Sequence, residues 1–418
     1  LAGLQAPAVR AFALHAARLD PGPVPWPGGA PEAAGLSVHG ACQTLAMAAC
    51  WDEACEGLAF AHGRPGVPVV AAVLALATTT RCTWAAALQA VVLGYEIGGR
   101  MGARLRIKPG MHVDAGWPAL GSAAAAARLL GGHAATVRAA VELAAAQLPF
   151  GLYLPIEQGA DGRNTYLGHA ASLGVHAAMA ATSGVCAPRG AVEAHARLAL
   201  GRETLGGLDP AEGWLLQEGY LKRWPAVRHV HYGICAAQAI RAQWPGLGDR
   251  GVDPSQVQRV VLRAYPEALT YCGNRSPRAP IQAQFSLSFG LAVALVLGDL
   301  DVSAYREPTF SDPRMRRLEG LVELEADASL GLHGRRAVEL EVELTRGQRM
   351  HVCVDSIDGD AGHPLDRQAV RAKFIRYASQ AVPERAAIRA AAEGSGPWSL
   401  DTRATVGDWW RDLSGQDL

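Results

Sequence analysis

The sequence predicts a mainly α-helical protein with a smaller α+β part. The chain has 418 residues, which is too long for one ordinary hydrophobic core, so two domains are expected. Ala and Gly dominate a composition that is half apolar and only 19% charged, which suits closely packed helices because small side chains let helix axes approach. Residues 338–344 (VELEVEL) alternate strictly between apolar and acidic side chains, as a half-buried strand does.

Helical patterns fill the first part of the chain. Small and apolar residues run without a breaker over several stretches, and Gly, Pro or Thr residues separate these stretches. The expected helices cover residues 36–49, 69–77, 84–101, 117–130, 134–146 and 170–184.

The pattern changes near residue 246. The expected strands cover residues 257–265, 321–326, 337–345 and 350–354, with helices before Gly298 and after Asp312. Asp366 is a good N-cap where the chain returns to helix. We therefore predict a helical domain of residues 1–240 and 362–418, with an α+β domain of residues 241–361 between its two parts.

Composition and charge exclude several classes of function. The formal net charge is zero and the basic residues are scattered, so we expect no nucleic-acid partner. The longest apolar runs, such as residues 67–77, are too short to cross a membrane. The eight cysteines include no C-x-x-C pair, which argues against a zinc site or a disulfide framework. No signal peptide is recognised in LAGLQAPAVRAF, so a reducing cytoplasm is expected.

The most informative stretch runs from Gly94 to Ala127. One expected helix ends in GYEIGGRMG, a short basic segment follows, and Pro109-Gly110 then breaks the chain and presents His112 before an Ala-dense helix. A histidine on a turn between two buried helices is well placed for chemistry, because rigid elements hold such a loop in position. The alternative is a histidine that only caps or solvates the second helix.

Other segments carry further candidate residues. Arg64 is suited to bind a carboxylate through its planar guanidinium, or else it is a surface-loop arginine. Asp52 and Glu53 form a small acidic cluster, or else a solvated helix end. His231 stands near the start of an expected helix, where the helix dipole favours the neutral imidazole that a general base needs. His229 lies two residues earlier, but no acidic or cysteine partner stands at a metal-ligand spacing, so no metal site is predicted.

These segments resemble the MmgE/PrpD family, which contains 2-methylcitrate dehydratase, cis-aconitate decarboxylase and iminodisuccinate epimerase. Residues 94–102 (GYEIGGRMG) are similar to the family pattern G-[FY]-E-x-x-x-R-x-G. Residues 110–112 (GMH) are similar to its G-[FW]-H, with Asp114 in place of a threonine. The resemblance implies a large helical domain, a smaller α+β lid, an active site between them, homodimers and metal-independent chemistry. Its common theme is abstraction or delivery of a proton at a carbon next to a carboxylate.

The resemblance assigns several positions of the site. His112, Lys222 and His231 stand where the family motifs have histidine, lysine and histidine. Tyr166 stands at a histidine position, and Phe289 replaces a tyrosine and offers no hydroxyl.

Further positions of the site are altered in this chain. Arg64 replaces a motif histidine, for which His62 is a nearby substitute. The acidic cluster of the family motif is reduced to Asp52 and Glu53. Arg163 replaces a lysine. Because the pKa of arginine stays above about 12, Arg163 would bind and polarise a carboxylate rather than transfer a proton.

We therefore expect a cofactor-independent lyase or isomerase that acts on a small carboxylate or polycarboxylate by dehydration, decarboxylation or epimerisation. No dinucleotide-binding G-x-G-x-x-G and no P-loop is present. The expected catalytic residues are His112, His231 and Arg163, with the order of base and acid left open. The expected substrate-binding residues are Arg64, Asp52, His62, Tyr166, Lys222 and Phe289. The alternative is a member that has lost catalysis and serves as a binding or partner subunit.

Overall fold

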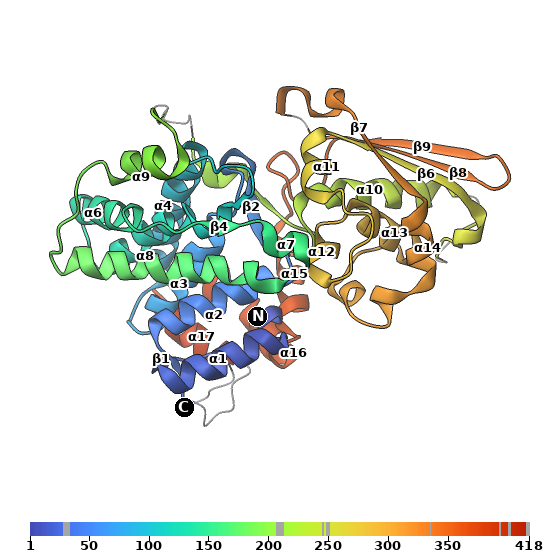
Figure 1. Ribbon diagram of the computed structural model, residues 1–418. Helices are drawn as coiled ribbons and strands as arrows, with labels where there is room; N and C mark the ends of the chain where they lie inside the picture. The colour runs from blue at the N-terminus through green and yellow to red at the C-terminus, as the bar shows by residue number, and fades with distance from the viewer. Residues whose placement is uncertain are drawn as a thin grey trace.

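Two bodies lie side by side in the computed structural model, a helical body and an α/β body (Figure 1). The structure describes residues 1–27, 34–205, 213–244, 246–247, 251–334, 336–392, 394–399 and 403–414. Helices dominate these residues and strands are few, which confirms the prediction of a mainly α protein with a smaller α+β part.

The helical body is built around a central helix, α5 (Pro118–Leu129). Every residue from Pro118 to Ala127 is buried, and α5 contacts α3, α4, α6 and α8. The short side chains of this Ala-rich helix allow four neighbours to approach it. The elements of the first half are α1 (Pro7–Leu19), β1 (Pro21–Val24), α2 (Val38–Trp51), α3 (Gly66–Ala77), α4 (Trp84–Arg104), α6 (Ala134–Ala145), α7 (Leu154–Gln158), α8 (Tyr166–Thr182) and α9 (Ala191–Leu200).

The crossing of α4 and α5 depends on two glycines. A Cβ atom added at Gly121 would lie 2.5 Å from the carbonyl oxygen of Gly94, and one added at Gly94 would lie 2.8 Å from that of Gly121. The two helix backbones are therefore in direct contact. This contact sets the distance between the end of α4 and the start of α5, and so holds the connection that carries His112.

The α/β body contains a four-stranded sheet in the order β7-β6-β8-β9. Strands β6 (Val257–Ala264) and β7 (Val322–Ala326) are parallel, whereas β8 (Val338–Leu344) and β9 (Arg349–Val354) pair antiparallel. The apolar residues of β8 are buried and its glutamates are partly exposed, as the alternation predicted. The helices of this body are α10 (Arg228–Gln243), α11 (Pro266–Cys272), α12 (Pro280–Gln284), α13 (Leu287–Leu297) and α14 (Pro313–Leu321).

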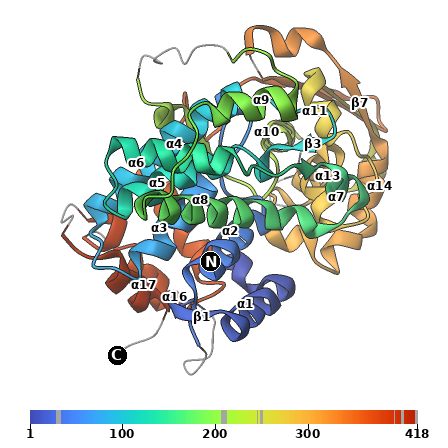
Figure 2. The ribbon, with the colours of Figure 1, turned by 60° about the vertical axis from the view of Figure 1, so that its left-hand side comes forward.

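Helix α10 belongs to the α/β body, although the sequence had placed residues up to 240 in the helical domain. It packs against α13, β8 and β9, and its buried side chains join a core that begins at Trp224. The chain then returns to the helical body through α15 (Arg367–Ala378), α16 (Glu384–Ala390) and α17 (Val406–Ser414). Helices α16 and α17 lie below α3 in Figure 2. The side chain of Asp366 caps α15 as predicted.

Two pairs of very short strands lie near the meeting of the bodies. Strand β2 (Glu56–Leu58) pairs with β5 (Gly219–Leu221), and β3 (Met111–His112) pairs with β4 (Gly151–Leu152). At two or three residues each, they carry no periodicity that a sequence pattern could reveal. Among the described residues, no helix is long and apolar enough to span a bilayer.

Replacing Gly121 by alanine tests the close contact of α4 and α5. The new Cβ would meet a backbone oxygen that cannot rotate away, so Gly121→Ala is expected to lower the free energy of unfolding by about 1–3 kcal/mol. Gly320→Ala is the matched control, because a Cβ on this helical glycine meets nothing within 4 Å. It should leave stability unchanged or raise it by up to about 1 kcal/mol. Urea denaturation of both variants measures the difference, and equal stabilities would contradict the packing described.

Candidate active site

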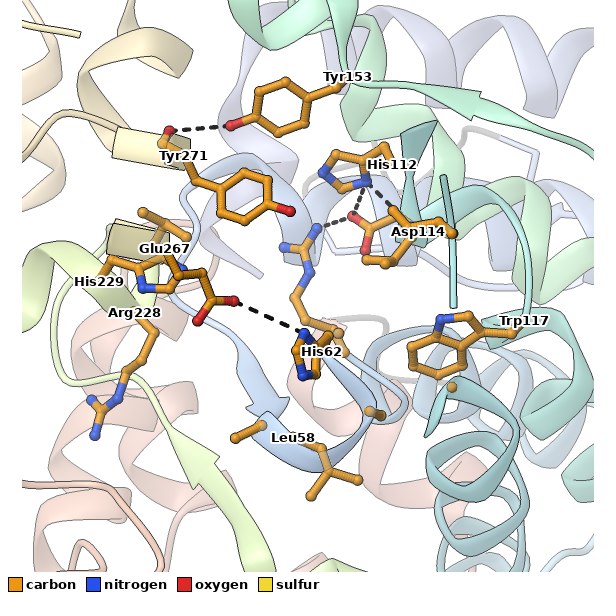
Figure 3. Close-up of a pocket in the computed structure, with 18 of the residues that line it drawn as sticks. Leu58, His62, His112, Asp114, Trp117, Tyr153, Arg228, His229, Glu267 and Tyr271 are labelled. Carbon is orange, nitrogen blue, oxygen red and sulfur yellow. Dashed lines mark hydrogen bonds and ion pairs between the residues drawn. The ribbon is translucent and has the colours of Figure 1, made fainter. Parts of the chain in front are cut away.

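A cavity of about 270 Å³ lies where the two bodies meet (Figure 3). The helical body supplies the wall around His62, Arg64 and His112, and the α/β body supplies the wall around His229 and Tyr271. Lys222, from the segment that links the bodies, also lines the cavity. Both bodies therefore contribute polar side chains to one cavity.

His112 is held in a defined orientation at one side of the cavity. Strand β3 fixes its backbone against Gly151, and its ring stacks on Tyr153 with 5.9 Å between ring centroids. The backbone N–H of Asp114 donates to Nδ1 of His112 at 3.2 Å. Because Nδ1 accepts this hydrogen bond, the proton of the neutral imidazole is on Nε2.

His112 is neutral at physiological pH. Burial lowers the pKa of His112 to about 4, and Arg163 and Arg64 add to the lowering, while Asp114 opposes it. The carboxylate oxygen Oδ2 of Asp114 lies 3.7 Å from Nδ1. The ring can therefore donate a hydrogen bond from Nε2 without first carrying a positive charge.

A buried ion network lies beside His112, and Glu53 is at its centre. The Oε1 atom of Glu53 accepts hydrogen bonds from Arg64, at 2.8 Å, and from Arg163, while Oε2 accepts one from Lys222. Arg64 also donates to Oδ2 of Asp114. Glu53 follows α2 with a φ of 50°, a left-handed backbone conformation that turns its side chain inward.

The network carries a net charge of +1, since three cations (Arg64, Arg163 and Lys222) face two carboxylates (Glu53 and Asp114). Burial alone would raise the pKa of both carboxyl groups, but the surrounding cations hold the pKa of Glu53 well below its usual range and also lower that of Asp114. The Oδ1 atom of Asp114 and the Nη1 atom of Arg163 are buried and have no hydrogen-bond partner within the described part of the chain. An anion bound here would balance the charge.

His229 lines the opposite side of the cavity, and the sequence analysis had not selected it. Its Nδ1 atom forms a short hydrogen bond with the hydroxyl of Tyr265, and its ring stacks on Tyr271 with 6.2 Å between centroids. Burial lowers the pKa of His229 to about 3, and Arg336 adds to the lowering. The only signal in the sequence was its place two residues before His231 at the start of the same helix.

His231 does not line the cavity. Its side chain is fully buried in the α/β core, where Nδ1 lies 3.2 Å from a guanidinium nitrogen of Arg228 and Nε2 lies 3.2 Å from the carbonyl oxygen of Ala226. Trp224 packs edge-on against the ring. Residues two apart on a helix point about 200° apart, so only one of the two histidines can face the cavity.

Two tyrosine rings connect the two cavity histidines across the boundary between the bodies. Tyr153 stacks on His112, Tyr271 stacks on His229, and the two tyrosine rings lie 5.7 Å apart (Figure 3). The hydroxyl of Tyr153 donates to the backbone carbonyl of Tyr271 at 3.2 Å. These contacts form one continuous wall of the cavity.

Three other residues predicted for the site do not line the cavity. Phe289 is fully buried in α13, stacked on Tyr305, so it lies in the α/β core and not in the cavity wall. Asp52 and Tyr166 also lie outside the cavity wall, although Tyr166 packs edge-on against the ring of His112.

Four predicted residues do reach the site. His62, Arg64, Lys222 and His112 line the cavity, and Arg163 supports it from the network behind. His62 has a left-handed φ of 52°, and its ring lies 3.9 Å from the carboxylate of Glu267 on α11. Among the described residues, no three His, Cys, Asp or Glu side chains gather in a group that could hold a metal ion.

Removing the charge of Glu53 tests the ion network. Glu53→Gln leaves three buried cations with one carboxylate, so the free energy of unfolding should fall by about 3–5 kcal/mol at pH 7. Glu323→Gln is the control: its partner Arg259 is on the exposed sheet face, where solvent screens the pair, and its effect should be far smaller.

The difference in the free energy of unfolding between wild type and Glu53→Gln should depend on pH. The pKa of Glu53 is depressed in the folded state, so its contribution is complete above the ordinary pKa of a glutamate and is lost as the pH falls toward the folded value. Wild type and Glu53→Gln should therefore converge in stability in acid. A constant difference at all pH values would contradict the ionised state of Glu53.

Comparisons with known protein families agree with this architecture. The MmgE/PrpD N-terminal domain model matches residues 1–201, and the MmgE/PrpD C-terminal domain model matches residues 224–395. No match was found among curated proteins. The second match begins at Trp224, where the core of the α/β body also begins. The two models together cover nearly the whole chain, which therefore belongs to the MmgE/PrpD family, a family of enzymes that are in general dehydratase-like lyases and isomerases.

Proposed function

We propose that this cavity transfers protons at a carbon next to a carboxylate group, in a lyase or isomerase reaction on a small carboxylate. The observation that carries the proposal is the pairing of two neutral histidines, His112 and His229, on opposite sides of one cavity beside a cationic network. Such a reaction needs a base, a proton donor and positive charge to stabilise an enolate-like intermediate.

His229 is the proposed base. In this assignment its Nδ1–H donates to the hydroxyl of Tyr265, and the lone pair on Nε2 accepts the proton from the substrate carbon. As the C–H bond breaks, its electron pair moves toward the adjacent carboxylate. Arg64 and Lys222, which line the cavity, stabilise the negative charge that collects on the carboxylate oxygens.

His112 is the proposed proton donor. Its Nε2–H is positioned by the hydrogen bond from the Asp114 N–H to Nδ1. In an elimination, the electron pair of the intermediate forms a C=C bond while the bond to the leaving group breaks, and His112 protonates that group. In an epimerisation, His112 returns a proton to the opposite face of the carbon. The donor then recovers its proton from solvent or from the protonated base.

Exchange of substrate hydrogen with solvent tests these roles. The protein would be incubated in heavy water with citrate, methylcitrate, aconitate, itaconate, tartrate or aspartate, and deuterium entry next to a carboxylate followed by NMR. His229→Gln should reduce exchange at least about 100-fold. His112→Ala should do the same, because the intermediate loses its hydrogen-bond donor.

His231→Gln is the control for the choice between the two histidines of α10. It should retain exchange per folded molecule, because its ring is buried away from the cavity. Loss of exchange in a folded His231→Gln, with His229→Gln still active, would reverse the assignment. Binding of these acids without exchange in the wild type would favour the alternative of a non-catalytic binding subunit.

The pH profile of exchange gives a second test. Because the pKa values of His112 and His229 are lowered to about 4 and about 3, both rings stay neutral through the ordinary histidine pKa near 6.5. The exchange rate constant should therefore be level between about pH 8 and 5 and fall only at more acidic pH, as His229, the proposed base with a pKa of about 3, becomes protonated. The unfolded chain binds protons at a higher pH than the folded chain does, so stability also declines below about pH 6.5 and must be followed by circular dichroism. A rate that halves near pH 6.5 in folded protein would be evidence against neutral histidines.

A further inference from the structure

Four charged or titratable side chains line the cavity apart from the His112–Asp114 pair, and two of them, His62 and Glu267, are seen facing each other in Figure 3. We call His62, Arg106, Glu267 and Arg336 the rim cluster; all four line the cavity. The carboxylate of Glu267 lies 3.9 Å from the ring of His62 and 3.8 Å from a guanidinium nitrogen of Arg336.

Arg106 has hydrogen-bonding capacity that the protein does not use. Its Nη2 atom donates to the backbone carbonyl of Phe60 at 3.0 Å, which fixes the guanidinium group. Its Nη1 atom is buried and has no hydrogen-bond partner among the residues that the structure describes. A buried guanidinium N–H without an acceptor is costly, and a carboxylate is the acceptor that fits its planar geometry best.

The rim cluster carries one unbalanced positive charge. Arg106 and Arg336 contribute +2 and Glu267 contributes −1, while burial and the two arginines lower the pKa of His62 and keep its ring neutral. Arg228, which also lines the cavity, is paired with Asp360 through an Nε–Oδ1 contact of 3.0 Å. Unbalanced charge among the described residues therefore occurs in two places, the rim cluster and the network around Glu53, whose third cation, Arg163, lies behind the cavity wall.

The cavity wall also has an apolar part, formed by Leu58, Leu105, Ile107, Val113 and Trp117. A substrate carboxylate placed against this surface would lose its hydration without gaining a cation, which is strongly unfavourable. The wall instead favours a hydrocarbon segment. Two separate positive charges and an apolar surface are complementary to an anion of charge −2 with an uncharged body.

We propose that Arg106 is a specificity-determining residue that binds a second substrate carboxylate, so that the preferred substrates are small dicarboxylates with an apolar body rather than tricarboxylates. This inference rests on the proposed function, in which the first carboxylate lies beside the network around Glu53. Arg336 adds positive charge at the same place, and Glu267 and Phe60 hold the two arginines in position.

Calorimetric titration of the full chain with defined anions tests the charge preference. The probes are butanoate with one carboxylate, methylsuccinate with two, tricarballylate with three, and inorganic phosphate. Methylsuccinate should bind at least about tenfold more tightly than each of the others. Butanoate and phosphate fill only one of the two positions, and the third carboxylate of tricarballylate would lose its hydration against the apolar wall. Tighter binding of tricarballylate or of phosphate would overturn the proposal.

Arg106→Gln tests the residue itself. It should weaken methylsuccinate binding about tenfold or more and change butanoate binding less than about threefold, which removes the preference for a dicarboxylate. Arg104→Gln is the matched control, because it removes the same charge two residues earlier from a side chain that faces Glu193 outside this cavity. Its affinities should stay within about twofold of wild type. If Arg106→Gln weakened the binding of methylsuccinate and of butanoate by the same factor, the assignment would be overturned.

Two further measurements keep the result interpretable. Arg106→Lys preserves the charge and should retain part of the preference, and it replaces Arg106→Gln if that variant does not fold. Heavy-water exchange with methylsuccinate separates the two proposals. If the binding preference for a dicarboxylate depends on Arg106 but no exchange occurs, only the proposed proton-transfer chemistry is rejected. Exchange without such a preference rejects the role of Arg106 alone.

Discussion

The carboxylate of Glu53 is the interaction on which the rest of the site depends. It accepts hydrogen bonds from Arg64, Arg163 and Lys222, which lie far apart in the sequence. Without this anion, three buried cations would face one carboxylate and repel one another. Asp114 extends the same network to His112, so the orientation of the histidine and the ionisation of the network are coupled.

The cavity exists because two differently built bodies meet at this network. The helical body owes its close packing to alanines and glycines, such as Gly94 and Gly121, that bring α4 and α5 into backbone contact. The α/β body presents α10 and α11 to it, and the stacked rings of Tyr153 and Tyr271 join the two. Any opening of the bodies would break these contacts together with the pairing of His62 and Glu267.

Much of the fold could be predicted because local patterns determine it. The helices and the long strands occur where periodicity placed them, and Asp366 caps α15 as predicted. The short strands β3 and β4 could not be found, because pairs of residues carry no period. The boundary before α10 was missed for a related reason: a helical pattern does not say which of two cores the helix will join.

For the site, the sequence by itself determined the family and the chemical character of the cavity, because His112, Arg64 and Lys222 stand in recognisable motifs. Only the tertiary structure decided that His229 rather than His231 faces the cavity, since the packing of α10 on α13 sets the rotation of the helix. It also decided that Glu53, and not Asp52, joins the site, because a left-handed turn after α2 directs that side chain inward. The net charge of each part of the cavity depends on which side chains lie next to one another. Distances between residues that are far apart in the sequence cannot be read from the sequence itself.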